Sequence, residues 1–218
     1  MNEALLSRVR GQPASSPCSH SWISPVFPAP RFPPDSPVAR LRVMSQHAST
    51  SPHRIGLGTD RHRLEPGLPL VLAGVTIPSE IGAVGHSDAD VVFHSLADAL
   101  LGAVGEGDIG ELFPDTDPRY QGLDSRRIVE EALRRVQLRG FQAENVDIVI
   151  ELERPKLLPH RPAMRTSIAA LLGVEESCVG VKAKTGEGLG PVGEGKMIAA
   201  TAVVLLVGVL AVGEENTK

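Results

Sequence analysis

The sequence predicts one layered domain of α-helices and β-strands over about residues 53–213, preceded by a segment without a core-forming pattern. Two observations lead to this prediction. Segments with strand-like and helix-like spacing of apolar residues interleave along this part of the chain. In addition, the composition is 42% hydrophobic but only 3% aromatic, so the core has to be built from Val, Leu, Ile and Ala.

The first half of the domain contains three predicted strands and one predicted helix. Arg54–Gly58 is the first strand, and Leu70–Ala73 and Val75–Ile77 are two short strands. Asp88–Val104 is predicted to be helical because its apolar residues recur at intervals of three and four. Ser87 or Asp88 is the expected N-cap of that helix.

The second half continues the alternation. Asp124–Arg139 has the pattern of an amphipathic helix, and Gly140 is expected to end it. Asn145–Glu153 alternates between apolar and polar residues, which predicts a strand. A third helix, Pro162–Leu172, and a further strand, Cys178–Ala183, follow.

The apolar stretch Met197–Gly213 is open to two interpretations. Its length is at the short limit of a membrane span. Its valines favour extended structure instead, and only the terminal Lys218 supplies a basic flank. We therefore expect a buried strand and no membrane partner.

Residues 1–52 differ from the rest of the chain and are expected to be disordered. They hold half of the 18 prolines, ten serines and only two acidic residues, Glu3 and Asp35. This composition fits an organelle transit peptide, although its prolines suit a helical presequence poorly. Alternatively, translation begins at Met44 and the upstream residues have no function.

Charge and cysteine content limit the function further. A net charge of −4 argues against nucleic acid as the main partner. The two cysteines, Cys18 and Cys178, are too few and too far apart for a disulfide framework. A reducing compartment is expected, the cytoplasm in the first place or a plastid if the leader is a transit peptide.

Three residues form a candidate metal site. Asp60 and His62 are two apart in a segment predicted to run from a strand into a loop, so their side chains share a face. His94 lies on the first predicted helix. One carboxylate and two imidazoles suit zinc with one coordination position open. Asp98 is expected to orient an imidazole, while a plain surface pair of Asp90 with His94 is the alternative.

Two loops carry further polar residues. The stretches Gly107–Gly110 and Leu112–Pro118 contain three carboxylates, at Asp108, Asp115 and Asp117, which suit hydroxyl groups or a hydrated cation. The segment Lys182–Gly190 is rich in glycine and follows a predicted strand, so its backbone N–H groups could hold phosphates.

Together these residues resemble the 2-C-methyl-D-erythritol 2,4-cyclodiphosphate synthase family of non-mevalonate isoprenoid biosynthesis. The matching stretches are Arg54–His62, His86–Asp90, Ala97–Gly102, Gly107–Gly110, Leu112–Pro118, Asp124–Arg126, Asn145–Asp147, Pro155–His160 and Lys182–Gly190. They cover essentially all of residues 53–218, which the resemblance identifies as the synthase domain.

The resemblance implies an α+β fold, a two-layer sandwich with helices on one face of a mixed sheet. It also implies a homotrimer with sites between subunits. The family consists of phosphorus–oxygen lyases that convert 4-diphosphocytidyl-2-C-methyl-D-erythritol 2-phosphate to the 2,4-cyclodiphosphate and CMP. Zinc or another divalent transition metal, together with Mg²⁺ or Mn²⁺ on the diphosphate, would be the cofactors.

The resemblance also implies roles for individual residues. Asp60, His62 and His94 would bind zinc, with Asp60 and His62 also facing substrate, and Glu187 would bind Mg²⁺. His86 and Thr185 would be the catalytic groups. The remaining substrate contacts would be Ser87, Asp108, Gly110, Phe113, Asp115, Asp117, Leu152, Pro155, Lys156, Leu157, Leu158 and Lys184, with Leu152–Leu158 reaching cytosine from a neighbouring subunit.

The sequence departs from the family pattern in the phosphate loop. Lys184 and Gly186 stand where threonines are common, Pro191 where an aromatic residue is frequent, and Glu194 where a basic residue is usual. Two other classes of function remain open. A zinc hydrolase would use Asp98 or Asp90 as its base, and a trimeric metal or nucleotide sensor would bind without turnover.

Overall fold

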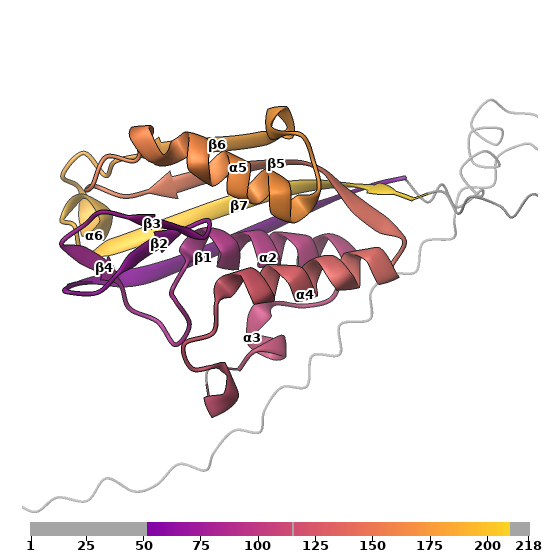
Figure 1. Ribbon diagram of the computed structural model, residues 1–218, viewed down its shortest axis with the longest axis horizontal. Helices are drawn as coiled ribbons and strands as arrows, with labels where there is room; N and C mark the ends of the chain where they lie inside the picture. The colour runs from indigo at the N-terminus through magenta and orange to yellow at the C-terminus, as the bar shows by residue number, and fades with distance from the viewer. Residues whose placement is uncertain (1–51, 115, 210–218) are drawn as a thin grey trace, which may run out of the picture. The chain divides into compact units, whose positions relative to one another are not determined.

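The computed structural model describes residues 52–114 and 116–209 (Figure 1). Predictions that concern residues 1–51, Asp115 and 210–218 lie outside these ranges. The described residues form an α+β sandwich, in which three helices cover one face of a five-stranded sheet (Figure 1). The helices are α2 (Val91–Val104), α4 (Ser125–Leu138) and α5 (Arg161–Leu172). The predicted two-layer architecture is therefore confirmed.

The sheet is mixed and has the strand order β4-β1-β7-β5-β6. Only the β5–β6 pair is parallel, whereas β1 pairs antiparallel with β4 and β7, and β5 with β7. The strands are β1 (His53–Pro66), β4 (Ile81–Ala83), β5 (Phe141–Glu151), β6 (Val179–Lys184) and β7 (Met197–Gly208).

Smaller elements connect these layers. Strands β2 (Leu70–Leu72) and β3 (Val75–Ile77) form the predicted hairpin. Two four-residue helices, α3 (Ile109–Leu112) and α6 (Gly190–Gly193), interrupt segments that were expected to be loops. Strand β4 was also missed, because three residues are too few to show a period of two.

Strand β1 is longer than predicted, and this corrects the placement of two site residues. The pairing with β7 continues through His62 and Arg63, and β4 then pairs with Leu64–Pro66. Because these partners satisfy the backbone hydrogen bonds, the strand does not end after Gly58. Asp60 and His62 consequently lie inside a strand and not where a strand enters a loop.

The apolar run at the C-terminal end of the domain forms β7, the central strand of the sheet. Its alternate residues Ile198, Ala200, Ala202, Val204 and Leu206 are buried beneath the helices. The strand interpretation is confirmed for the described part of this run. In the described ranges, no helix combines the length and the apolar character that crossing a membrane requires.

Helix α2 begins at Asp90, which corrects the prediction of Ser87 or Asp88 as its N-cap. Asp90 is completely buried, and its Oδ1 accepts hydrogen bonds from the amides of Val92 and Phe93, each at 3.1 Å. The same carboxylate accepts from Ala73 at 2.9 Å and Gly74 at 2.6 Å in the β2–β3 turn. Burial raises the pKa of Asp90 to about 6 against the opposing effect of these hydrogen bonds. One side chain therefore starts the helix and anchors the hairpin.

Two glycines let α2 lie directly on β1. A Cβ atom at Gly58 would stand 2.0 Å from the carbonyl oxygen of Ser95, and one at Gly56 would stand 1.8 Å from that of Ala99. Both distances are far below van der Waals contact with rigid backbone atoms. The helix can approach this strand closely only because neither position has a side chain.

We predict that Gly58→Ala destabilises the fold by about 3 kcal/mol or more, the upper end of the usual range for overpacking, because the added methyl group meets helix backbone. Urea unfolding would measure the loss. Gly102→Ala is the matched control in α2, since a Cβ atom at Gly102 would lie 3.9 Å from its nearest neighbour, the carbonyl oxygen of Leu57. It should be neutral or stabilising by up to about 1 kcal/mol. Equal effects of the two substitutions would contradict the close-packing argument.

Candidate functional site

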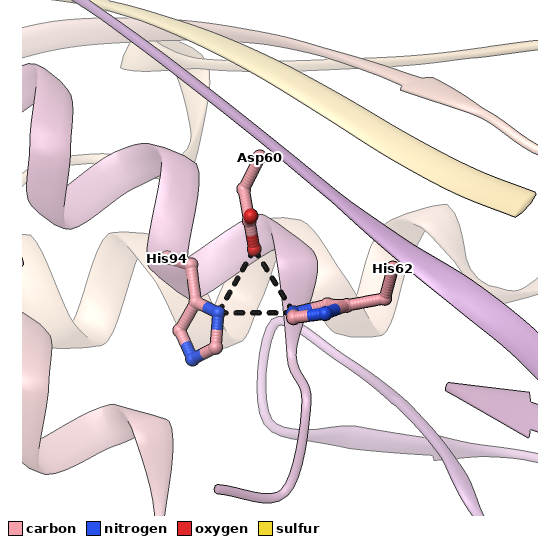
Figure 2. A group of neighbouring side chains, drawn as sticks. All are labelled: Asp60, His62 and His94. Carbon is pink, nitrogen blue, oxygen red and sulfur yellow. Dashed lines mark hydrogen bonds and ion pairs between the residues drawn. The ribbon is translucent and has the colours of Figure 1, made fainter. Parts of the chain in front are cut away.

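Asp60, His62 and His94 converge as the sequence predicted (Figure 2). Strand β1 supplies the first two residues, and the first turn of α2 supplies His94. Asp60 Oδ2 lies 3.0 Å from His62 Nε2 and 2.9 Å from His94 Nδ1, and the two ring nitrogens are 3.2 Å apart. Three atoms of metal-ligating type therefore surround one point.

This spacing fits a metal ion of the zinc class. Ligand atoms about 2.0–2.1 Å from a tetrahedral ion lie about 3.3 Å from one another, close to the three separations seen here. Burial alone would raise the pKa of Asp60, but hydrogen bonds and charge interactions with His62 and His94 outweigh it and hold that pKa well below its usual range. The carboxylate is therefore ionised, as a metal ligand has to be.

The second ring nitrogen of His94 has partners that the sequence did not indicate. Nε2 lies 2.9 Å from Ser125 Oγ and 3.1 Å from Ser87 Oγ. The prediction that Asp98 orients an imidazole is not supported, because Asp98 Oδ1 accepts a hydrogen bond from the amide of Ile109 at 2.8 Å. The hydroxyl of Ser125 was missed because it comes from another helix, although it lies in one of the matched stretches.

A surface pair between Asp90 and His94 is also wrong. Asp90 has no exposed surface, and His94 is 7% exposed. The carboxylate of Asp90 is used by four backbone N–H groups and forms no side-chain contact with the imidazole. Their spacing of four residues gives instead an ordinary helical hydrogen bond, from the amide of His94 to the carbonyl oxygen of Asp90.

A cavity of about 1080 Å³ opens over the three ligands. Among the predicted substrate residues, His86, Ser87, Gly110, Phe113 and Asp117 line it. The wall also includes residues for which the sequence predicted no role, namely Arg61, Tyr120 and Gln121. The cavity is large enough for an extended small molecule that would reach the ligand group at one end.

The loop that forms one wall is held together by local contacts. The rings of Phe113 and Tyr120 meet edge to face at 5.2 Å. Arg119 binds Asp117 through three N–H···O contacts of 2.6–3.1 Å, which lower the pKa of this carboxylate. Asp108 does not line the cavity, because it caps the short helix α3 by accepting from the amide of Glu111. Asp115 lies outside the described residues.

A second group of predicted residues lies elsewhere in the same chain. Leu152 follows the end of β5, and Lys184 is the last residue of β6, with Thr185 and Glu187 just beyond it. None of these residues lines the cavity. Asp60 is opposite Ala200, Ala200 is opposite Ile150, and Ile150 is opposite Ala183. Three such steps between strands amount to roughly 14 Å across the sheet. One chain therefore keeps the two groups apart.

The second group is ordered by its own contacts. Thr185 Oγ1 donates to Glu187 Oε1 at 2.5 Å, and the amide of Gly186 donates to Glu153 Oε2 at 3.1 Å. Glu187 has a φ of 51°, an unusual left-handed conformation for a residue other than glycine. Such conformations are often found at binding loops.

The residues predicted to contact cytosine divide by exposure. Leu152 and Leu157 are each 3% exposed and belong to the core, whereas Leu158 is 70% exposed and Lys156 is also exposed. Pro155 is half-buried. Within one chain, the outward-facing members of this segment do not reach the cavity.

Comparison with known proteins gives a consistent assignment. The model of the YgbB family matches residues 53–207. The 2-C-methyl-D-erythritol 2,4-cyclodiphosphate synthase of Bordetella avium is 52% identical over 157 residues, which covers 72% of this chain and 97% of that protein. A relative from Oryza sativa subsp. japonica has the same name with the qualifier chloroplastic. It is 40% identical over 211 residues, which covers 93% of this chain and 95% of that protein.

The fold comparison agrees with these relatives. A solved 2C-methyl-D-erythritol-2,4-cyclodiphosphate synthase in a CDP-bound form is 49% identical, with a TM-score of 0.66, covering 70% of this chain and 99% of the other. The family match spans the strand and helix that carry Asp60, His62 and His94 as well as the second residue group. The chain therefore belongs to the YgbB family, the 2-C-methyl-D-erythritol 2,4-cyclodiphosphate synthases.

Proposed function

We propose that this chain converts 4-diphosphocytidyl-2-C-methyl-D-erythritol 2-phosphate to 2-C-methyl-D-erythritol 2,4-cyclodiphosphate and CMP. The activity is that of its family, a phosphorus–oxygen lyase of isoprenoid precursor biosynthesis. The observation that supports it best is the Asp60–His62–His94 group in the wall of a cavity of suitable size. An open metal position beside such a cavity is suited to a phosphate-bearing substrate.

The reaction needs little from the protein beyond folding the substrate and neutralising charge. An oxygen of the 2-phosphate attacks the phosphorus nearer the methylerythritol. The bond from that phosphorus to the bridging oxygen breaks, and this oxygen leaves as part of CMP. Nucleophile and electrophile belong to one molecule, so orientation lowers the barrier substantially. The attacking phosphate is already ionised and requires no general base.

We assign the residues of the cavity to the methylerythritol and phosphate end of the substrate. Asp60, His62 and His94 would hold zinc or a similar ion, which supplies positive charge for phosphate oxygens when bound. His86 and Ser87 stand beside this group at the cavity wall and would donate hydrogen bonds to phosphate. Gly110, Phe113 and Asp117 also line the cavity and would contact the methylerythritol unit.

The second group would bind the diphosphate and cytosine of a substrate held by a neighbouring subunit. Thr185 and Lys184 would contact phosphate, and Glu187 would hold Mg²⁺ or Mn²⁺. The exposed residues Lys156 and Leu158 would reach toward the cytosine. This division is supported by the roughly 14 Å that separates β1 from β6 in one chain, which is too far for both groups to surround one phosphate.

A homotrimer would bring the two groups together. It is supported by the sheet face opposite the helices, where β1 and β7 present apolar side chains to solvent. Ile55 is 71% exposed, Leu57 65% and Val203 36%. Adjacent exposed aliphatic residues on a two-strand surface are typical of an interface, and a closed symmetric ring would bury the same face in every subunit.

The hydrolase alternative is less well supported by the geometry. It would require a base beside a metal-bound water, and Asp90 and Asp98 were the candidates. Asp90 is fully buried and bonded to backbone amides, and Asp98 accepts from the amide of Ile109. Neither residue lines the cavity.

We propose the cytoplasm as the compartment of this chain, or a plastid if residues 1–52 are a transit peptide. The match to the chloroplastic rice relative covers 93% of this chain, which is more than residues 53–218 alone provide, so it extends into residues 1–52. This extension supports the transit-peptide interpretation of the leader, with residues 53–218 as the synthase domain.

We predict that Asp60→Ala, His62→Ala and His94→Ala each abolish zinc retention, because each removes one of three ligands. Metal analysis of the purified variants would test this, and circular dichroism would check the fold. His86→Ala is the control, since it changes the cavity wall without removing a ligand, and it should keep its zinc. Full zinc content in all three ligand variants would rule out the site.

We predict that Glu187→Gln raises the magnesium requirement and lowers turnover by about 10²-fold, the usual scale for losing one electrostatic contact in the transition state. Zinc content should not change. Thr185→Ala should lower turnover without changing the magnesium requirement, since its hydroxyl would contact phosphate. CMP release followed by phosphorus NMR at several magnesium concentrations would measure both. Normal turnover of both variants at limiting magnesium would exclude the loop from catalysis.

We predict a sedimenting species of about three times the 23.1 kDa chain mass, less any leader removed. Inactive His94→Ala and Leu158→Arg chains should complement each other when co-expressed. The Leu158→Arg chain keeps an intact cavity, and the His94→Ala chain keeps an intact cytosine-binding segment. In trimers assembled at random from equal amounts of both chains, about a quarter of the interfaces combine the two. Mixed trimers that release no CMP would contradict the shared site.

A further inference from the structure

We propose that Ser125 and Asp88 form a positioning relay for His94. The relay fixes which ring nitrogen of His94 carries the proton and turns the lone pair of Nδ1 toward Asp60 and His62. The inference rests on the metal site of the proposed function. It adds two residues that are not metal ligands and that act through His94.

The central contact of the relay, between Ser125 and His94, is buried. His94 is 7% exposed and Ser125 has no exposed surface. Ser125 Oγ is 2.9 Å from His94 Nε2, and the same hydroxyl is hydrogen-bonded to Asp88 Oδ1. Asp88 Oδ2 also accepts from the backbone amide of Ser125 at 3.3 Å, so the carboxylate holds this serine at two atoms.

The chemistry of the three groups sets the direction of the hydrogen bonds. The Ser125 hydroxyl donates its single proton to Asp88 Oδ1, where the carboxylate oxygen is the acceptor. The Ser125 oxygen then has only lone pairs for His94, and Nε2–H has to be the donor. In a neutral imidazole Nδ1 is then unprotonated, and this is the nitrogen that lies 2.9 Å from Asp60 Oδ2 and 3.2 Å from His62 Nε2.

Ser87 fits the same direction. Its hydroxyl oxygen lies 3.1 Å from His94 Nε2 and accepts from the amide of Ala89, so it can share the Nε2 proton as a second acceptor. Ser87 and Asp88 belong to the loop that carries His86 at the cavity wall, and Ser125 is the first residue of α4. The relay therefore connects the loop at the cavity wall to a metal ligand.

Metal affinity tests the relay without relying on turnover. The full chain and its Ser125→Ala variant would be titrated with zinc against a chromophoric chelator, and cobalt-loaded samples would be compared by visible absorption. Loss of a partner that orients a ligand typically weakens metal binding by about 10–100-fold. We expect a loss of this size for Ser125→Ala, with a changed cobalt spectrum. Asp88→Asn should act in the same direction, because its amide group cannot accept at both oxygen positions.

Asp124 supplies the matched control. It caps the same helix end by accepting from the amide of Arg126 at 2.9 Å, and its carboxylate is not among the hydrogen-bonding partners of the His94 ring in the described ranges. Asp124→Ala should lower the melting temperature while leaving zinc affinity and the cobalt spectrum unchanged. The relay would be overturned if the Ser125→Ala and Asp124→Ala variants bound zinc equally well. It would also be overturned if the loss of zinc affinity in both variants simply followed the loss of thermal stability. A wild-type chain that binds neither zinc nor cobalt would overturn the metal site itself and the relay with it.

Discussion

The close contact between helix α2 and strand β1 is the constraint on which the rest of the structure depends. Gly56 and Gly58 leave room for the helix backbone, and the carbonyl oxygens of Ser95 and Ala99 occupy the space that side chains would take. This approach brings His94 within hydrogen-bonding distance of a carboxylate from the strand. Interiors are packed too densely for such a contact to be adjusted by small shifts, so a change at the glycines would move a metal ligand.

A second constraint acts at the start of the same helix. Asp90 holds the first turn of α2 and the turn between β2 and β3 through one buried carboxylate. The adjoining loop, which includes Ser87 and Asp88, is fixed to α4 through Ser125. The position of His94 is thus determined by the strand below it, the hairpin beside it and a second helix. A binding group held on several sides retains its geometry when substrate arrives.

Much of this arrangement could be predicted from the sequence, and the failures have physical causes. The period of two in β5 and the helical spacing in α4 reflect burial on one face, which the order of apolar and polar residues records directly, whereas α2 is buried on almost all sides. The three residues that could hold a metal ion were recognisable because their chemistry is unusual for a strand and a helix. In contrast, the length of β1 depends on pairing with β4 and β7, and Ser125 contacts His94 across 31 positions of sequence. Neither a partner strand nor a distant hydroxyl leaves a local pattern.

The strict alternation along β1 also determines which insertions and deletions the protein can tolerate. Asp60 and His62 face the helices, whereas Ile55 and Leu57 face the opposite side of the sheet. Adding or removing one residue between Leu57 and Asp60 would reverse every side chain beyond that point, which turns the ligands outward and apolar residues inward. A change of two residues would preserve the faces and shift only the register. In a lineage of such proteins, length variation should therefore be confined to the loops, and this strand should change only by substitution.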